Sequence, residues 1–145
     1  MKKPLIQLAL DCSSTEEAIR ECRGGVVDAV DILECGYSLI AAEGARVVKI
    51  FRDLYPDKPL VADLKIVDAG SKIGGMLLDG KPDYTTILCA CEPGTITSVK
   101  EEADKRGLNT VLQMELYGRW SFDDIEMWKK CGIKQLTLQH SGDKP

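Results

Sequence analysis

The chain has 145 residues, 44% hydrophobic and 29% charged, a composition typical of one ordinary soluble globular domain. Its formal net charge of −4 and its lack of Lys/Arg runs argue against a nucleic-acid-binding surface. We see no signal peptide and no apolar run that could span a membrane. The six cysteines are scattered without zinc-ligand spacing, so we expect reduced thiols and a cytoplasmic location.

Apolar runs and helical patterns alternate along the chain. We expect strands at residues 5–10, 29–33, 59–66, 84–90, 110–114 and 135–139. We expect helices at about 14–24, 40–55, 69–78, 95–106 and 121–131. Ser14 with Glu17, and Ser121 with Asp124, fit capping boxes at two helix starts. The glycines of the 69–78 helix indicate that this helix depends on close packing.

This alternation, with strands apolar on both faces, predicts a parallel sheet covered by helices. An open doubly wound sheet fits the length better than a (β/α)8 barrel, but no Gly-rich phosphate loop follows the first strand. The acids at successive strand ends favour the barrel, because its carboxyl ends converge on one site. We therefore expect one domain over residues 1–145, a TIM-type (β/α)8 barrel represented by its first five to six βα units, without the C-terminal ones.

The candidate site residues lie where strands end. Asp11, Glu34 and Glu115 end the first, second and fifth strands, and Asp63 and Lys65 share one face at the end of the third. Burying such charges is costly unless they pair or serve a site. Lys65 lies between Asp63 and Asp68 in the sequence, and an ammonium flanked by carboxylates stays protonated.

Each candidate also has a structural interpretation. The group Asp63, Lys65 and Asp68 could be an ion-pair cluster that caps a strand. Asp11 could cap the turn of residues 13–17, and Glu34 could be a solvent-facing loop carboxylate. Glu115 could lie on the surface and His140 could be a solvated residue near the chain end. Trp120 and Trp128 could serve in packing instead of contacting a substrate.

Several motifs carry a family resemblance over nearly the whole chain, from Pro4 to about Asp143. They are Ala9–Asp11, Asp31–Gly36, Ala42–Gly44, Leu54–Lys58, Ala62–Gly70 and Gln113–Leu116. In this order they resemble the orotidine-5′-phosphate decarboxylase suprafamily, and within it the 3-keto-L-gulonate-6-phosphate decarboxylases. The shared signature of that suprafamily is Asp-x-Lys-x-x-Asp, here Asp63, Lys65 and Asp68.

The resemblance implies a reaction and a cofactor. The reaction is the Mg²⁺-dependent decarboxylation of 3-keto-L-gulonate 6-phosphate to L-xylulose 5-phosphate, through a metal-stabilised enediolate, in L-ascorbate catabolism. It further implies a homodimer with its active sites at the interface. Since loss of CO₂ from a β-keto acid needs an electron sink, a divalent cation with oxygen ligands is a suitable cofactor.

The resemblance also implies a role for each residue. Glu34 and Asp63 would hold the metal, and Asp11, Glu34 and Lys65 would bind the substrate. Lys65 would stabilise the enediolate. Asp68 would act in the neighbouring subunit's site. Glu115 would line the pocket.

The chain departs from this family in two places. The family's proton-guiding His and Arg correspond to Gln139 and Gly142, with His140 one position late. His140 stays a candidate catalytic residue, and His140–Gly142 resembles the related 3-hexulose-6-phosphate synthases, aldolases that condense formaldehyde with ribulose 5-phosphate. The family's phosphate-binding loops, which follow the last two strands, are absent. The first and sixth strands should then expose unpaired edges, and a catalytically inactive barrel fragment is an alternative.

Overall fold

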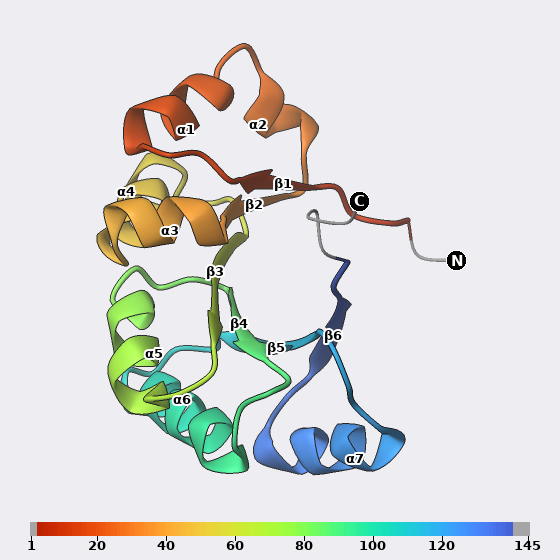
Figure 1. The fold of residues 1–145 in the computed structure, drawn as a ribbon. Helices are drawn as coiled ribbons and strands as arrows, with labels where there is room; N and C mark the ends of the chain where they lie inside the picture. The colour runs from red at the N-terminus through yellow and green to blue at the C-terminus, as the bar shows by residue number, and fades with distance from the viewer. Residues whose placement is uncertain (1–2, 141–145) are drawn as a thin grey trace.

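Strands and helices alternate along the chain as the sequence predicts. The computed structural model describes residues 3–140 (Figure 1). The strands are β1 (Gln7–Leu10), β2 (Ile32–Cys35), β3 (Leu60–Ile66), β4 (Tyr84–Leu88), β5 (Val111–Leu116) and β6 (Gln135–Leu138). The helices are α1 (Thr15–Glu21), α2 (Val26–Ala29), α3 (Tyr37–Glu43), α4 (Arg46–Leu54), α5 (Gly70–Leu78), α6 (Pro93–Lys105) and α7 (Phe122–Cys131).

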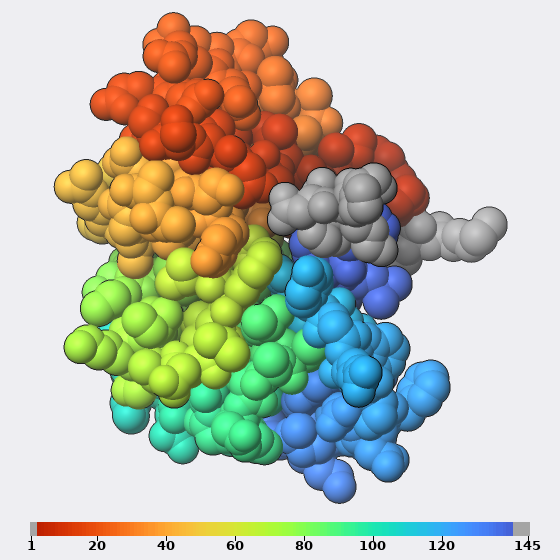
Figure 2. Space-filling view, viewed as in Figure 1, coloured from red at the N-terminus to blue at the C-terminus, as the bar shows by residue number. Residues whose placement is uncertain are grey.

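The six strands form one sheet in the order β1-β2-β3-β4-β5-β6, and every neighbouring pair is parallel. The strands follow an arc, with helices along its outer side (Figure 1). Successive segments fill successive sectors of the space-filling view (Figure 2). This is the geometry of a partial TIM-type barrel, which confirms the predicted fold class.

The hydrophobic core lies between the sheet and the outer helices. Side chains alternate between the two faces of a strand, so Leu33 and Ile87 point towards the helices and are fully buried. From the helices, Phe51, Ile96 and Trp128 pack into the same cluster. The packing role expected of Trp128 is therefore confirmed.

Two predicted helix boundaries are wrong, and one of the errors lies at a glycine. The expected helix over 40–55 is two helices, because Gly44 ends α3 with a φ of 77° and its N–H bonds Ile40 O at 2.8 Å. The helix expected to run to Gly24 ends at Glu21, and the short α2 occupies Ala29, which was expected in a strand.

Of the two predicted capping boxes, one is confirmed. Ser121 and Asp124 exchange both capping hydrogen bonds at the start of α7. At the start of α1, the Ser14 side chain accepts from Glu17 N, but the Glu17 carboxylate accepts from Ser13 N and Oγ instead. The predicted hydrogen bond from Ser14 N to the Glu17 carboxylate is therefore wrong, because the donor is the preceding residue, Ser13.

The two outer strands each have one partner among residues 3–140, β2 for β1 and β5 for β6. Leu5 and Ile6, just before β1, are exposed, and Leu138 on β6 is 81% exposed. The predicted exposure of these two edges is confirmed. None of the helices in this part of the chain is both long and apolar enough to cross a membrane.

Close packing of α5 on α6 generates a stability prediction. A Cβ at Gly70 would lie 2.3 Å from Thr95 O, a backbone atom that cannot move away cheaply. Gly70→Ala should therefore lower the free energy of unfolding by about 1–3 kcal/mol, measured by urea denaturation. Gly94→Ala is the matched control, since a Cβ there meets no atom within 4 Å. An equal effect of both substitutions would contradict this account.

Candidate active site

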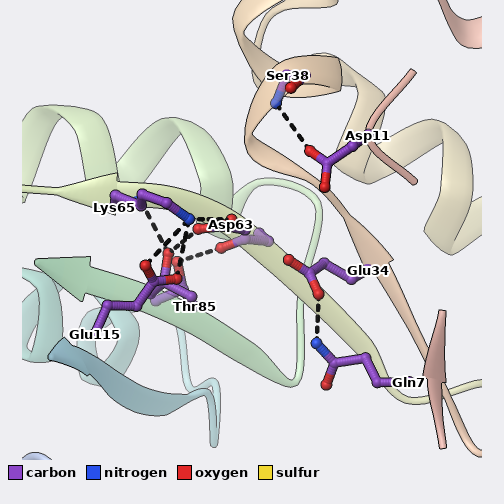
Figure 3. Close-up of polar contacts among 10 residues, drawn as sticks. Gln7, Asp11, Glu34, Ser38, Asp63, Lys65, Thr85 and Glu115 are labelled. Carbon is purple, nitrogen blue, oxygen red and sulfur yellow. Dashed lines mark hydrogen bonds and ion pairs between the residues drawn. The ribbon is translucent and has the colours of Figure 1, made fainter. Parts of the chain in front are cut away.

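A cavity of about 320 Å³ opens where the carboxyl ends of the strands meet, and all six strands contribute to its lining. Its charged lining residues are Asp11, Glu34, Asp63, Lys65 and Glu115. Residues distant in the sequence converge here because the strands are parallel and the sheet is curved. The structure thus brings together the five strand-end charges singled out in the sequence, and their catalytic roles stay predictions (Figure 3).

Lys65 lies at the centre of this charge cluster. Its Nζ is 2.6 Å from Asp63 Oδ2 and 3.1 Å from Glu115 Oε1 (Figure 3). Burial alone would lower the pKa of Lys65, but the hydrogen bond and charge of Asp63, with those of Glu115, leave that pKa raised. Lys65 is therefore a fixed positive charge at the cavity.

Glu115 is almost completely buried, with 3% of its surface exposed. Burial raises the pKa of its carboxyl, and the nearby charge of Asp63 raises it further, against the opposing effect of Lys65. Both carboxylate oxygens lie 3.1 Å from Lys65 Nζ, but Oε2 has no hydrogen-bond partner in the described chain. Glu115 Oε2 is therefore a buried carboxylate oxygen whose charge is compensated by the nearby Lys65 ammonium and by no hydrogen bond within the described chain.

Glu34 lies on the inner face of β2, where Gln7 Nε2 donates to its Oε2 (Figure 3). Burial raises the pKa of this carboxyl to about 7. The Gln7 hydrogen bond lowers the pKa, whereas the charges of Asp63 and Asp11 raise it. Glu34 is therefore not the solvent-facing loop carboxylate of the alternative interpretation.

Asp11 follows β1 and faces the start of α3. Its Oδ1 accepts a hydrogen bond from Ser38 N at 3.3 Å (Figure 3). The helix that Asp11 was alternatively expected to cap, α1, is capped by Ser14 instead. Asp11 thus contacts the neighbouring βα unit and leaves its carboxylate at the cavity.

Asp68 and His140 do not line this cavity, and both are exposed. Asp68 Oδ1 accepts from Ala69 N at 2.6 Å. The expected placement of Lys65 between Asp63 and Asp68 is therefore wrong, because its second partner is Glu115. Gln139 lines the cavity, and Gly142 lies outside the described residues.

Sequence reasoning missed three residues that contact the charge cluster. They are Gln7, which bonds Glu34, Thr86, which bonds Asp63, and Tyr37, whose ring centre is 5.5 Å from Lys65 Nζ. That last distance suits a cation–π contact. Gln7 was recognisable as a polar residue in an otherwise apolar run, but nothing in the sequence pattern marks Tyr37 or separates Thr86 from Thr85.

A larger hollow of about 600 Å³ lies between α4 and α5, outside the sheet. Arg46, Lys49 and Met76 are among its lining residues, and it contains none of the predicted site residues. Size alone would favour this hollow. The smaller cavity is the better active-site candidate because it gathers buried ionisable groups with shifted pKa values.

The acids of the cavity suit a hard divalent cation that shares its coordination with substrate. Glu34 and Asp63 both line the cavity, and no group of three or more His, Cys, Asp or Glu side chains within residues 3–140 could hold a metal alone. Mg²⁺ usually binds through one or two carboxylates together with water and substrate oxygens. Burial is the main cause of the raised pKa of Glu34, and the added repulsion from Asp63 and Asp11 would be relieved by such an ion.

The pKa of Glu34 predicts how stability depends on pH. Between the ordinary pKa of 4.5 and about 7, the folded chain holds more protons on Glu34 than the unfolded chain. The free energy of unfolding should therefore fall as the pH rises through this window, by up to about 3 kcal/mol. Glu34→Gln should remove this part of the slope, as measured by urea unfolding at several pH values.

Asp53→Asn is the control, because the Asp53 side chain is 62% exposed on α4. That variant should keep the slope of the parent chain. An unchanged slope in Glu34→Gln would show that burial does not hold the proton on Glu34.

Three known proteins show what this chain is similar to. A probable 3-keto-L-gulonate-6-phosphate decarboxylase of Haemophilus influenzae is 39% identical over 150 aligned positions, which cover 99% of this chain and 66% of that protein. A crystal structure of KGPDC from Streptococcus mutans is 32% identical with a TM-score of 0.88, covering 97% of this chain and 64% of that one. 3-Hexulose-6-phosphate synthase from Salmonella typhimurium is 29% identical with a TM-score of 0.86, covering 97% and 65%.

The chain thus spans about two thirds of the length of these relatives. The family model of the orotidine 5′-phosphate decarboxylase / HUMPS family matches residues 4–145. The match confirms the resemblance seen in the sequence motifs, and the solved structures confirm the barrel fold. The chain belongs to the orotidine 5′-phosphate decarboxylase / HUMPS family.

Proposed function

We propose that this chain carries the active site of a Mg²⁺-dependent carboxy-lyase. The reaction converts 3-keto-L-gulonate 6-phosphate to L-xylulose 5-phosphate and CO₂, a step of L-ascorbate catabolism. The observation that carries the proposal is the ammonium of Lys65, fixed between Asp63 and Glu115 at the cavity. The decarboxylase names of the Haemophilus influenzae and Streptococcus mutans relatives support the same substrate class.

The geometry suits the charge that develops during loss of CO₂. Breaking the bond to the carboxylate carbon leaves an electron pair on the substrate, which moves to the ketone oxygen and gives an enediolate. Lys65 meets this negative charge without reorganising, because two carboxylates already hold its side chain in place. The raised pKa of Lys65 keeps it protonated at neutral pH.

Other residues at or near the cavity would bind the metal ion and the substrate or deliver a proton. Glu34 and Asp63 would hold Mg²⁺, and Asp11 and Glu34 would contact the substrate. When bound, the ion supplies positive charge at substrate oxygens without a proton transfer. His140, next to the cavity residue Gln139, is our candidate for delivering the final proton to the substrate carbon.

A homodimer is part of the proposal. Exposed apolar side chains follow the carboxyl ends of β2, β3 and β5, namely Tyr37, Val67, Tyr117, Trp120 and Phe122. Exposed apolar side chains at these strand ends support a second copy packed there, and the exposed Asp68 would then act in its partner's cavity. Sedimentation equilibrium that gives only the 15.9 kDa mass of one chain would contradict this arrangement.

The proposed location is the cytoplasm. All six cysteines are free thiols, four of them buried. A reducing compartment keeps such thiols unpaired.

An aldolase of the 3-hexulose-6-phosphate synthase type is the second candidate. The Salmonella typhimurium synthase has nearly the same TM-score as the Streptococcus mutans structure, 0.86 against 0.88. A third outcome is a catalytically silent chain. Binding energy at the substrate phosphate normally supports turnover, and this chain spans only about two thirds of the length of its relatives.

The first experiment measures CO₂ release from 3-keto-L-gulonate 6-phosphate with Mg²⁺. The parent chain should turn over, and Lys65→Ala should lose at least about 10²–10³-fold in kcat, since it removes a preorganised charge partner of the enediolate. Lys72→Ala is the matched control, because Lys72 is an exposed lysine on α5 and should leave kcat unchanged. Removal of Mg²⁺ with EDTA should abolish release, and added Mg²⁺ should restore it.

The same samples separate the alternatives. Condensation of formaldehyde with ribulose 5-phosphate in place of CO₂ release would favour the aldolase. A folded chain with neither activity would overturn the proposed function of this chain and leave its family membership unchanged.

A further inference from the structure

The backbone of Lys65 is strained. Its φ is 49°, in the left-handed region that residues with a Cβ seldom occupy. The pairing of β3 with β4 is irregular between Ala62 and Ile66, so Lys65 lies within the irregular part of the ladder. A conformation of this kind persists only where surrounding contacts enforce it, and such contacts gather at functional sites.

The side chain of Thr86, on β4, supplies such a contact. Lys65 N donates a hydrogen bond to Thr86 Oγ1 at 2.9 Å, and Oγ1 lies 2.6 Å from Asp63 Oδ1. The Lys65 N–H can only donate, so the single hydroxyl proton of Thr86 is left for the bond to Asp63. The hydroxyl of Thr86 therefore accepts from Lys65 and donates to Asp63.

These bonds close a ring around the Lys65–Asp63 pair. Asp63 Oδ1 accepts from Thr86, while Asp63 Oδ2 accepts from the ammonium of Lys65 at 2.6 Å. Thr86 is 3% exposed and Asp63 is 4% exposed, so water has little access to replace either bond. One hydroxyl thus fixes both the backbone of the lysine and the carboxylate that orients its side chain.

The neighbouring Thr85 provides a natural comparison. It is fully buried on the same strand, and its hydroxyl donates to Ala62 O at 3.0 Å. Thr85 does not line the cavity, whereas Thr86 does. The two residues therefore share size, strand and burial, and differ in whether the hydroxyl contacts the charge cluster.

We propose that Thr86 is a positioning residue, which holds Lys65 in its left-handed conformation and aligns the Lys65–Asp63 pair towards the cavity. Its consequence for turnover rests on the proposed decarboxylation. The positioning itself is a property of the folded chain without substrate, so it can be measured separately.

The test compares the full chain with Thr86→Val, Thr86→Ser and Thr85→Val. The first readout is hydrogen exchange of the Lys65 amide by NMR. Thr86→Val should speed this exchange at least about tenfold relative to Thr85→Val, because the amide loses its hydrogen-bond acceptor and the Thr85 variant corrects for general destabilisation. Thr86→Ser keeps the hydroxyl and should keep the protection of the parent. Thr86→Ala replaces Thr86→Val if the latter does not fold.

The second readout is CO₂ release. Thr86→Val should lower kcat at least about tenfold with KM within about threefold, while Thr86→Ser and Thr85→Val stay close to the parent. Unchanged exchange at Lys65 in Thr86→Val, or an equal kcat loss in Thr85→Val, would overturn the proposal. A parent chain without turnover would contradict the proposed function, and the exchange measurement would still decide the positioning.

Discussion

The ammonium of Lys65 compensates two carboxylates that the fold almost completely removes from water. Asp63 and Glu115 are 4% and 3% exposed, and a buried carboxylate without a partner costs several kcal/mol. The compensation is incomplete, because Asp11 and Glu34 add two further acids to the same cavity. The raised pKa values of Glu34 and Glu115 are the result of burial together with this surplus of negative charge. The site is therefore electrostatically unsatisfied by the chain alone and is suited to a cation.

The curved sheet can hold this surplus of negative charge because one of its faces packs against the helices and the other lines the cavity. On β2, Leu33 faces the helices and the adjacent Glu34 faces the cavity. On β4, Ile87 packs in the core and the adjacent Thr86 meets the charge cluster. Apolar burial on the outer face stabilises the fold, and that stability holds the inner face in an arrangement that is costly by itself.

The sequence was sufficient to predict the order of the six strands, the barrel and the acids at its strand ends. These features depend on local patterns, which are readable from short windows. The pairing of Lys65 with Glu115 was not predictable, since the two residues lie 50 positions apart and meet only through the curvature of the sheet. The break at Gly44 was missed because apolar spacing continues across it. The left-handed backbone of Lys65 has no signal in residue type, because lysine carries no preference for that region.

Within residues 3–140, each strand of the sheet pairs only with its neighbours in chain order. Residues joined in the ladders lie between 21 and 27 positions apart, as in Ile66 with Ile87 and Leu33 with Leu60. Closing each ladder therefore requires a loop of one βα unit, whose entropy cost grows only slowly with length. No ladder of the sheet has to wait for a segment more than one βα unit away. The sheet can therefore grow by one βα unit at a time, in the same order in which the ribosome synthesises these units.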